Sequence, residues 1–515
     1  MKIKFIWLYL FIIIMIFSAC STQADNGLKS GTTGQIDSRY EEQNSTNSIL
    51  YYYGVNTHSN RDMDFNGIFN EISLITENVL GFSVKFDFDM PVDYLKLLSQ
   101  RINSGDQVDV FDFLPAPDHI TMDIVSQYKL ADCTDLLSMY YPASQKLLDM
   151  HPEIMDSYVV DNKLYVAPGY ISSARSNLYA IIIDRTLQDK IGLTEINDFS
   201  EFLEVYTECI GKGLVKGDNV FYCDIDSFIR LYLKCYGYFY VEFGIFYDPK
   251  SKEIVPMENT PEFIEAYLMY QNMYQDGYVR EFPVDTNNLP PVNSLDAVLE
   301  NRYPIYPSKY LNMVASCILG YKQFDERYVL HTLNADESFY MSYRIAPYGV
   351  TDHGKVKEAL QFINLINTHQ EVYDLLRYGQ KDTNYILAGE KVEFTPDVVI
   401  GYNWRSSVFY NPDLERQFAY EDNDNYSIRI NNKANTPFSY QKYLESLLYI
   451  GGRPEGLDYA LFIAIRSLSE YGIGLKKSEL YEKIKNDLPV EEFIKLIWCS
   501  DMQEFIDIFK SFLIE

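Results

Sequence analysis

The sequence predicts an α/β protein with two lobes and a helical C-terminal extension. Strand and helix patterns alternate from residue 48 onward, a second alternating series begins at residue 178, and the residues after 444 have helical spacing alone. Behind a polar N-terminal stretch lie about 470 residues, more than the roughly 250–300 at which a single hydrophobic core stops growing. More than one lobe is therefore expected.

The first alternating series predicts a mainly parallel sheet. Ser48–Val55 is an apolar run typical of a buried strand, and Asp62–Leu80 has apolar residues at helical spacing. Phe82–Phe88 alternates strictly, Tyr94–Ile102 is helical in pattern, and Val108–Phe113 is a third strand. Strands that alternate with helices are joined by right-handed crossovers and lie parallel.

This arrangement predicts where a ligand would lie. In open α/β sheets the ligand crevice lies outside the carboxyl ends of the strands. The loops Asn56–Asp62 and Leu114–His119 follow the first and third strands. We therefore expect Asn56, Arg61 and Asp118 to face a ligand, the alternative being that these polar residues belong to solvated loops.

A hairpin and a second α/β series follow. Residues 158–167 are expected to form the hairpin, because Asp161-Asn162 tolerates the left-handed backbone of a tight turn, and Pro168-Gly169 is expected to end it. Thr260-Pro261 signals a helix start, with Thr as N-cap and Pro at the first position. The other predicted elements are strands at 178–184, 244–247 and 253–256 and helices at 185–191, 199–210, 227–236, 355–368, 371–378, 444–450, 457–471, 478–486 and 491–515.

The N-terminus has the pattern of a secretory signal. Lys2 and Lys4 precede the apolar run Phe5–Phe17, which is too short to span a bilayer as a helix of about 20 residues. Phe17-Ser18-Ala19-Cys20 resembles the bacterial lipobox, which implies that Cys20 becomes a lipidated first residue carrying acyl chains such as palmitate. The alternative is an ordinary signal peptide that ends by chance at a cysteine. Ser21–Asn47 is polar and is expected to be a flexible tether.

Composition excludes some partners and leaves others open. The net charge of −29 disfavours binding to nucleic acid or anionic lipid. The 45 Tyr and 31 Phe suit carbohydrate or peptide surfaces, although codon bias explains a Tyr excess equally well. The six cysteines besides Cys20 are scattered without a CxxC pair, and whether they form disulfides is left open; they are Cys133, Cys209, Cys223, Cys235, Cys317 and Cys499.

Motifs of catalysis are missing from the sequence. The six histidines lie at no metal-ligand spacing, and HExxH, GxSxG and GxxxxGK are absent. Acidic residues are so numerous that a carboxylate pair has no specificity as a glycosidase signal. No catalytic residue, metal or cofactor is therefore expected.

Three stretches resemble the extracellular solute-binding proteins (family 1) of carbohydrate-type ABC importers. Ser104–Phe111 resembles the family's "sGd-x-x-Dv" turn, Asp161–Pro168 its "gk-x-Y-g-x-P" segment, and Asp184–Leu193 its "n-x-x-l-x-x-k-x-G-l" stretch before a helix. A fourth stretch, Leu375–Tyr385, resembles LplA-type lipoproteins in Tyr378, Gly379 and Tyr385 but departs at residues 380–382.

The resemblance implies a type II periplasmic-binding-protein-like fold whose lobes close on a ligand. It implies a division into signal peptide (1–20), tether (21–48), N-lobe (49–168), C-lobe with return crossings (169–345) and a mixed, partly helical region that closes the cleft (346–515). Tyr170 and Arg175 then lie on the crossing segment, and Trp404 and Tyr410 near the cleft, although a lone Trp is more often a core residue.

Three functions are compatible with these observations. The first, which we favour, is a non-enzymatic, monomeric receptor, anchored by lipid to the outer face of the bacterial membrane, that captures an oligosaccharide or similar polar solute for ABC permease subunits. The second is an anchored extracellular glycoside hydrolase, which requires two carboxylates at about 5 or 6.5–9.5 Å. The third is a sensory binding lipoprotein that docks on a membrane kinase.

Overall fold

The computed structural model describes residues 48–55, 65–89, 94–113, 120–150, 158–172, 178–215, 220–242, 244–281, 304–308, 319–336, 343–395, 409–433, 465–466, 468 and 473–514. The predicted signal peptide, the tether up to residue 47, Cys20, Cys317 and the helix expected at 444–450 lie outside these residues. Of the helix expected at 457–471, only residues 465, 466 and 468 are described, and residues 465–466 are helical. Among the described helices, none has both the length and the apolar character needed to cross a membrane.

The first lobe is built on a five-stranded sheet in the order β2-β1-β3-β15-β6. The strands are β1 (Ile49–Val55), β2 (Ser83–Asp89), β3 (Val110–Asp112), β6 (Ala167–Ser172) and β15 (Tyr343–Val350). As predicted, β1 pairs in parallel with β2 and β3. β15 runs antiparallel to both of its neighbours, β3 and β6. The helices of this lobe are α2 (Phe65–Leu80), α3 (Tyr94–Ser104), α4 (Met122–Tyr128), α5 (Leu137–Tyr140), α6 (Ser144–Met150), α15 (Val356–Thr368) and α16 (Gln370–Tyr378).

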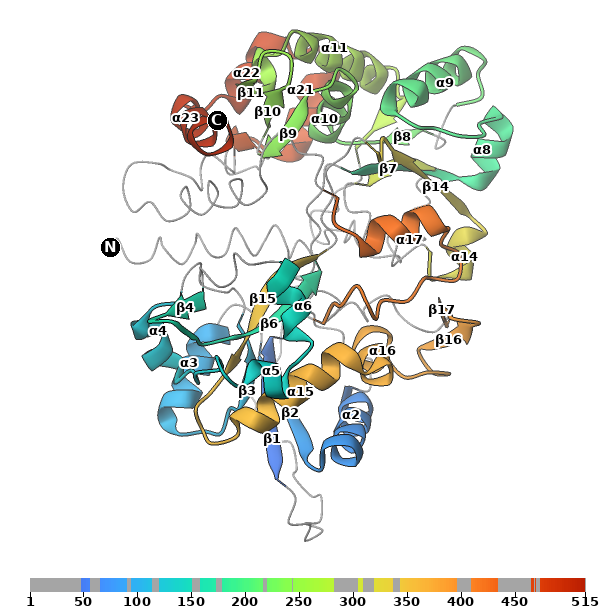
Figure 1. The fold of residues 1–515 in the computed structure, drawn as a ribbon. Helices are drawn as coiled ribbons and strands as arrows, with labels where there is room; N and C mark the ends of the chain where they lie inside the picture. The colour runs from blue at the N-terminus through green and yellow to red at the C-terminus, as the bar shows by residue number, and fades with distance from the viewer. Residues whose placement is uncertain are drawn as a thin grey trace, which may run out of the picture.

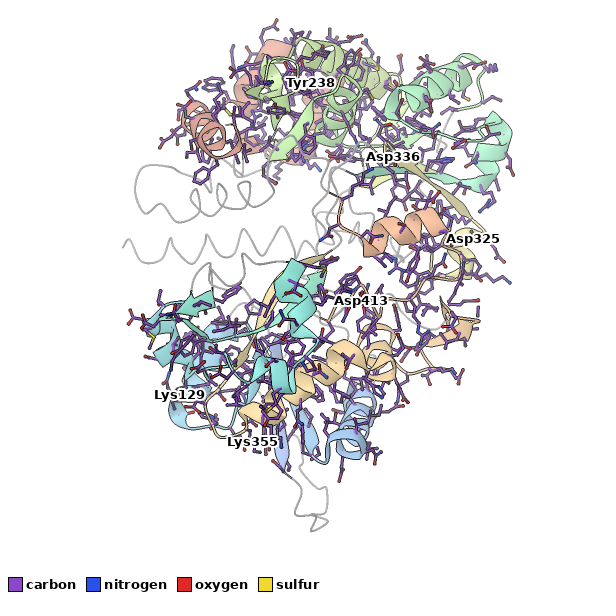
Figure 2. The ribbon with its side chains drawn as sticks, in the orientation of Figure 1. Lys129, Tyr238, Asp325, Asp336, Lys355 and Asp413 are labelled. Atoms are coloured by element: carbon purple, nitrogen blue, oxygen red, sulfur yellow. The ribbon has the colours of Figure 1, made fainter. Side chains whose placement is uncertain are left out.

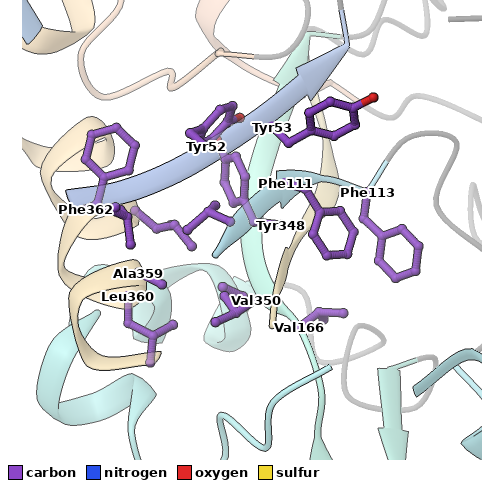
Figure 3. Close-up of a cluster of buried hydrophobic side chains, with 14 of the residues drawn as sticks. Tyr52, Tyr53, Phe111, Phe113, Val166, Tyr348, Val350, Ala359, Leu360 and Phe362 are labelled. Atoms are coloured by element: carbon purple, nitrogen blue, oxygen red, sulfur yellow. The ribbon is translucent and has the colours of Figure 1, made fainter. Parts of the chain in front are cut away.

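Large aromatic and branched side chains fill the core of this lobe. Tyr52 and Phe111, from two neighbouring strands, are at most 1% exposed, and Phe362 of α15 meets the Tyr52 ring edge-on with centroids 6.1 Å apart. Figure 3 shows this packing of strand residues against α15. Because α15 follows β15 in the chain, the returning strand and its helix complete the core that β1 begins.

The second lobe has its own five-stranded sheet, in the order β12-β8-β13-β7-β14. Its strands are β7 (Tyr179–Asp184), β8 (Phe221–Tyr222), β12 (Val279–Arg280), β13 (Ile305–Ser308) and β14 (Tyr328–Leu333). Its helices, with a short 3-10 turn η1 (Met257–Asn259), are α8 (Arg185–Ile191), α9 (Phe199–Gly211), α10 (Ile225–Cys235) and α11 (Pro261–Gln275).

Smaller elements complete the molecule. A three-stranded sheet of β9 (Phe239–Glu242), β10 (Ile245–Asp248) and β11 (Glu253–Pro256) packs on the C-terminal helix α23 (Met502–Leu513). The helices α21 (Lys477–Lys485) and α22 (Val490–Ile497) pack on α11. The remaining elements are β4 (Val159–Val160), β5 (Lys163–Leu164), α14 (Lys322–Asp325), β16 (Tyr385–Ala388), β17 (Lys391–Phe394) and α17 (Asn423–Ile430). Figure 1 shows the two lobes one above the other, with α17 between them. The predicted class, a two-lobed α/β fold with a helical C-terminal region, is confirmed.

Two local predictions are wrong. Pro168-Gly169 does not end the hairpin, because both residues lie inside β6, where Pro168 stands opposite Pro347 of β15. Because proline has no backbone N–H, two prolines that face each other in a sheet leave no donor unpaired. The C-terminal residues do not form one helix from 491, because Trp498–Asp501 separate α22 from α23.

The described cysteines form no disulfide with one another; they are Cys133, Cys209, Cys223, Cys235 and Cys499. Cys133, Cys209, Cys223 and Cys499 are buried, and Cys235 is half-buried. They act as small apolar core residues.

Candidate site at the interlobe junction

In both sheets, the carboxyl ends of every strand except β15 and β7 lie at the edge where the chain passes between the lobes. In the first sheet, the end of β6 at Ser172 pairs with the start of β15 at Tyr343, and β3 runs in the same direction as β6. In the second sheet, Ser308 at the end of β13 pairs with Ala180 near the start of β7, and β8 and β12 run parallel to β13. These edges are where open α/β sheets place ligands.

Three chain segments connect the lobes around this junction. β6 of the first sheet is followed by β7 of the second, and β14 of the second sheet is followed by β15 of the first. The third segment begins at Phe409 in the core of the first lobe and ends in α17, whose Ile428 packs on Leu178 and Ala180 of the second lobe. Side chains on these segments are therefore the ones that both lobes position.

An aromatic cluster forms where the three segments meet. We call it the junction cluster: Leu147 of α6, Tyr170 of β6, Tyr343 of β15 and Tyr410 of the third segment. The Tyr170 and Tyr343 rings meet edge-on with centroids 5.1 Å apart, and the Tyr343 and Tyr410 rings stack at 6.1 Å. Tyr170 and Tyr410 are buried, whereas Tyr343 is half-buried, so part of its side chain is exposed to solvent.

A charged pair lies at the edge of the junction cluster. Asp413 and Lys146 form an ion pair in which each side chain is about half exposed. Figure 2 shows Asp413 between the two lobes, well away from Lys129 and Lys355 in the first lobe and Tyr238 in the second. Burial raises the pKa of the Tyr170 and Tyr343 hydroxyls, and the nearby Asp413 carboxylate raises both further. Both tyrosines therefore stay neutral hydrogen-bonding groups at physiological pH.

The second lobe contributes a polar network at its own strand ends. Glu281 follows β12 and forms an ion pair with Lys477, the first residue of α21. Burial raises the Glu281 pKa to about 7, although Lys477 and a hydrogen bond from Tyr481 act in the opposite direction. Groups with perturbed pKa values at a ligand-facing edge are candidates for a functional role.

The structure brings together two of the residues predicted from the sequence. Tyr170 and Tyr410 both belong to the junction cluster, although 240 positions separate them in the sequence. The other predicted site residues lie outside the described part of the chain: Asn56, Arg61, Asp118, Arg175 and Trp404.

Sequence reasoning missed Tyr343, Asp413 and Lys146. Tyr343 begins a strand that was not predicted, because Tyr343–Val350 contains Pro347 and Gly349, which weaken a strand pattern. Asp413 and Lys146 are ordinary charged residues that lie 267 positions apart in the sequence. Only the fold brings them together in an ion pair. In the described residues no group of three or more His, Cys, Asp or Glu is arranged to hold a metal ion.

Fold and site together define a two-lobed α/β protein with an aromatic, polar junction between its lobes. Among curated proteins, the chain is 22% identical over 331 residues to a carbohydrate ABC transporter substrate-binding protein of Streptococcus pneumoniae. That match covers 62% of this chain and 61% of the relative. No protein-family model matches the chain.

Solved structures also align with the chain. The N-glycan transport solute-binding protein NgtS of Streptococcus pneumoniae aligns with a TM-score of 0.48 and 14% identity, covering 90% of this chain and 99% of that one. The S. pneumoniae ABC-transporter substrate-binding protein FusA, in complex with kestose, aligns with a TM-score of 0.49 and 14% identity, covering 90% and 100%. The similarity to a carbohydrate ABC transporter substrate-binding protein agrees with the resemblance predicted from the sequence.

Proposed function

We propose that this protein is the substrate-binding receptor of an ABC transporter and that it captures an oligosaccharide or a similar polar solute outside the cell membrane. The observation that carries the proposal is the junction cluster, in which Tyr170, Tyr343 and Tyr410 come from the three segments that connect the lobes. A ligand that contacts this cluster touches all three of the described connections between the lobes at once, so its binding energy acts directly on their relative orientation.

The chemistry of the junction suits a sugar. A tyrosine offers a flat apolar face and a hydroxyl, which match the two sides of a pyranose ring. Asp413 accepts hydrogen bonds from sugar hydroxyls, and Lys146 donates them, with both side chains about half exposed. The curated relative, named as a carbohydrate ABC transporter substrate-binding protein, supports the same ligand class.

The cellular setting follows from the N-terminus and is part of the proposal. The apolar run before Cys20 and the polar stretch after it support a lipid-anchored receptor on the outer face of a bacterial membrane. Its partners would be ABC permease subunits, and the receptor would act as a monomer without catalysis.

The test is a thermal-shift screen of the chain without residues 1–20 against oligosaccharides, peptides and polyamines. A ligand at 100 times its Kd adds about 2.7 kcal/mol to the unfolding free energy, which is an easily measured shift. Recovery of the unchanged ligand, checked by mass spectrometry, would support the receptor. Cleavage of the ligand would support the glycoside hydrolase instead. If no compound in the screen stabilises the chain, the receptor proposal fails, and pull-down on a membrane kinase would test the sensory role.

A further inference from the structure

A buried chain of alternating charges lies directly behind the junction cluster. Arg377 donates two hydrogen bonds to Glu415, at 2.8 and 2.9 Å, and Arg429 donates to Glu415 and, at 2.9 and 2.8 Å, to Glu421. The Glu415 and Glu421 side chains are fully buried, and the two arginines are 6% and 1% exposed. The four charges cancel, which is the condition for keeping them out of water.

We propose that Glu415 is a positioning residue for the ligand site, one that fixes Tyr410 and Asp413 against Tyr343 and makes that arrangement depend on the relative orientation of the lobes. The inference rests on the function proposed above, because it assigns Glu415 a role in that same site.

The first step of the argument is that Glu415 is held from both lobes. Arg377 lies on α16, whose Val372 and Leu376 belong to the core of the first lobe. Arg429 lies on α17, which is tied to the second lobe by Ile428 and by a hydrogen bond of 3.0 Å from Thr332 of β14 to Asn425. Figure 1 shows α16 against the lower lobe and α17 beside β14 and α14. Tyr373 and Tyr378 of α16 also pack in a cluster with Tyr306 and Tyr328 of the second lobe, so a rotation that separates α16 from α17 must break this cluster as well as one of the two ion pairs.

The second step is that the same network holds side chains of the junction cluster in position. The Tyr410 hydroxyl donates to the carbonyl of Arg429 at 2.7 Å, and its ring lies 5.6 Å from the Arg377 guanidinium. The Asn411 backbone N–H donates at 3.3 Å to the hydroxyl of Tyr373, which itself donates to Glu415. The Asn411 side chain in turn accepts from the backbone N–H of Asp413 at 2.9 Å. Two partners of Glu415 thus act on the third segment: Arg429 holds the Tyr410 side chain, and Tyr373 holds the backbone of Asn411, which in turn fixes the backbone of Asp413.

The third step is electrostatic. Burial alone would raise the pKa of Glu415, but Arg377 and Arg429 lower it below its ordinary value, so the carboxylate stays charged. Replacing it with a neutral group removes the carboxylate that Arg377 and Arg429 share, while Arg429 keeps its pair with Glu421. The strain relaxes most easily by moving α16 and α17 apart, which displaces Tyr410 and Asp413.

The test compares Glu415→Gln with the conservative Glu415→Asp and with Glu258→Gln. Glu258 is a matched control, because its buried pair with Arg466 at 2.7 Å lies in the second lobe away from the junction. The main probe is site-specific 3-fluorotyrosine at position 343, read by ¹⁹F NMR. The second is the distance between spin labels placed at Lys357 on α15 and at Lys212, which directly follows α9, measured by pulsed electron resonance.

Glu415→Gln is expected to shift and broaden the position-343 resonance and to widen the interlobe distance distribution, and Glu415→Asp to restore both toward wild type. Glu258→Gln should lower the melting temperature without either change. For any solute retained from the thermal-shift screen, Glu415→Gln should raise Kd roughly tenfold. A folded Glu415→Gln protein with a wild-type ¹⁹F signal and distance distribution would overturn the inference. If Glu415→Gln does not fold, Arg377→Lys, which keeps the charge and removes the paired geometry, is judged by the same criteria. These spectra need no ligand, so a failure of the receptor proposal in the screen is distinct from a failure here.

Discussion

The ring of Tyr343 meets the ring of Tyr170 edge-on, with their centroids 5.1 Å apart, across two antiparallel strands that carry the chain to and from the second lobe. Tyr410, on the third connecting segment, stacks on the other side of Tyr343. Because each ring comes from a different connection, the cluster reports on how all three are arranged. Ligand binding at this point and lobe orientation are therefore linked through the same side chains.

Replacement of Tyr343 by Ala is expected to weaken ligand binding more than it destabilises the fold. The ring is half-buried and makes two aromatic contacts, each worth about 0.5–1.5 kcal/mol, so the unfolding free energy should fall by about 1–3 kcal/mol. A ligand that stacks on this ring loses its main apolar surface. Calorimetric titration and urea unfolding measure the two effects separately. The control is Tyr236→Ala, at an exposed tyrosine of the second lobe. Equal Kd values for the two variants would show that Tyr343 does not contact the ligand.

Asp413→Asn should leave stability almost unchanged. The Asp413–Lys146 pair is about half exposed on both sides, and pairs of this kind contribute about 0–1 kcal/mol. A hydrogen bond from a ligand hydroxyl to a charged carboxylate contributes about 1.5–3 kcal/mol, so Kd should rise at least roughly tenfold. Glu208→Gln, which breaks the exposed Glu208–Lys212 pair on α9, provides the comparison. The role of Asp413 would be disproved by a ligand that binds the variant as tightly as the wild-type chain.

Glu281 is expected to make stability decrease as pH rises from about 4.5 to about 7. Burial raises its folded-state pKa from 4.5 to about 7, so in this window the folded chain holds more protons than the unfolded chain. The unfolding free energy then decreases with pH, and the penalty is complete above pH 7, at about 3 kcal/mol or less. Glu281→Gln should remove this slope. The difference between the two proteins in urea unfolding at pH 5 and pH 8 isolates Glu281 from other titrating groups, and parallel pH profiles would contradict the assignment.

The free thiols are expected to resist alkylation until the chain unfolds. Burial raises the Cys133 pKa to about 12, so the thiolate that reacts with iodoacetamide is scarce at pH 8. Half-buried Cys235, with its pKa raised by burial to about 11, should react first of the two. Mass-spectrometric mapping after timed labelling gives the order. A disulfide-linked peptide that joins Cys223 to Cys235 in the oxidised protein would contradict the free thiols of the structure.

The sequence predicts the fold much better than it predicts the site. The parallel strands β1 to β3 were evident because Ser48–Val55 and Phe82–Phe88 have strong periodicity and helices between them. The returning strand β15 was missed because Pro347 and Gly349 interrupt its pattern, and it is this strand that delivers Tyr343. Glu415 could not be singled out among 73 acidic residues, because its importance lies in contacts with Arg377 and Arg429 that the sequence does not display.

Gly349 is expected to be irreplaceable in the returning strand. A methyl group added there would overlap the ring of Phe111, which is fully buried in the first-lobe core on the neighbouring strand β3. Neither the ring nor the strand can move without disturbing the sheet that β15 completes, so Gly349→Ala should cost about 1–3 kcal/mol or more of unfolding free energy. Gly211→Ala, at the last residue of α9 where a methyl group meets no atom within 4 Å, should instead be neutral or stabilising by up to about 1 kcal/mol. Thermal unfolding of both variants makes the comparison. Because β15 also carries Tyr343, Gly349→Ala should weaken ligand binding through the altered strand. A variant that keeps both its stability and its ¹⁹F signal at position 343 would show that the core tolerates the added volume.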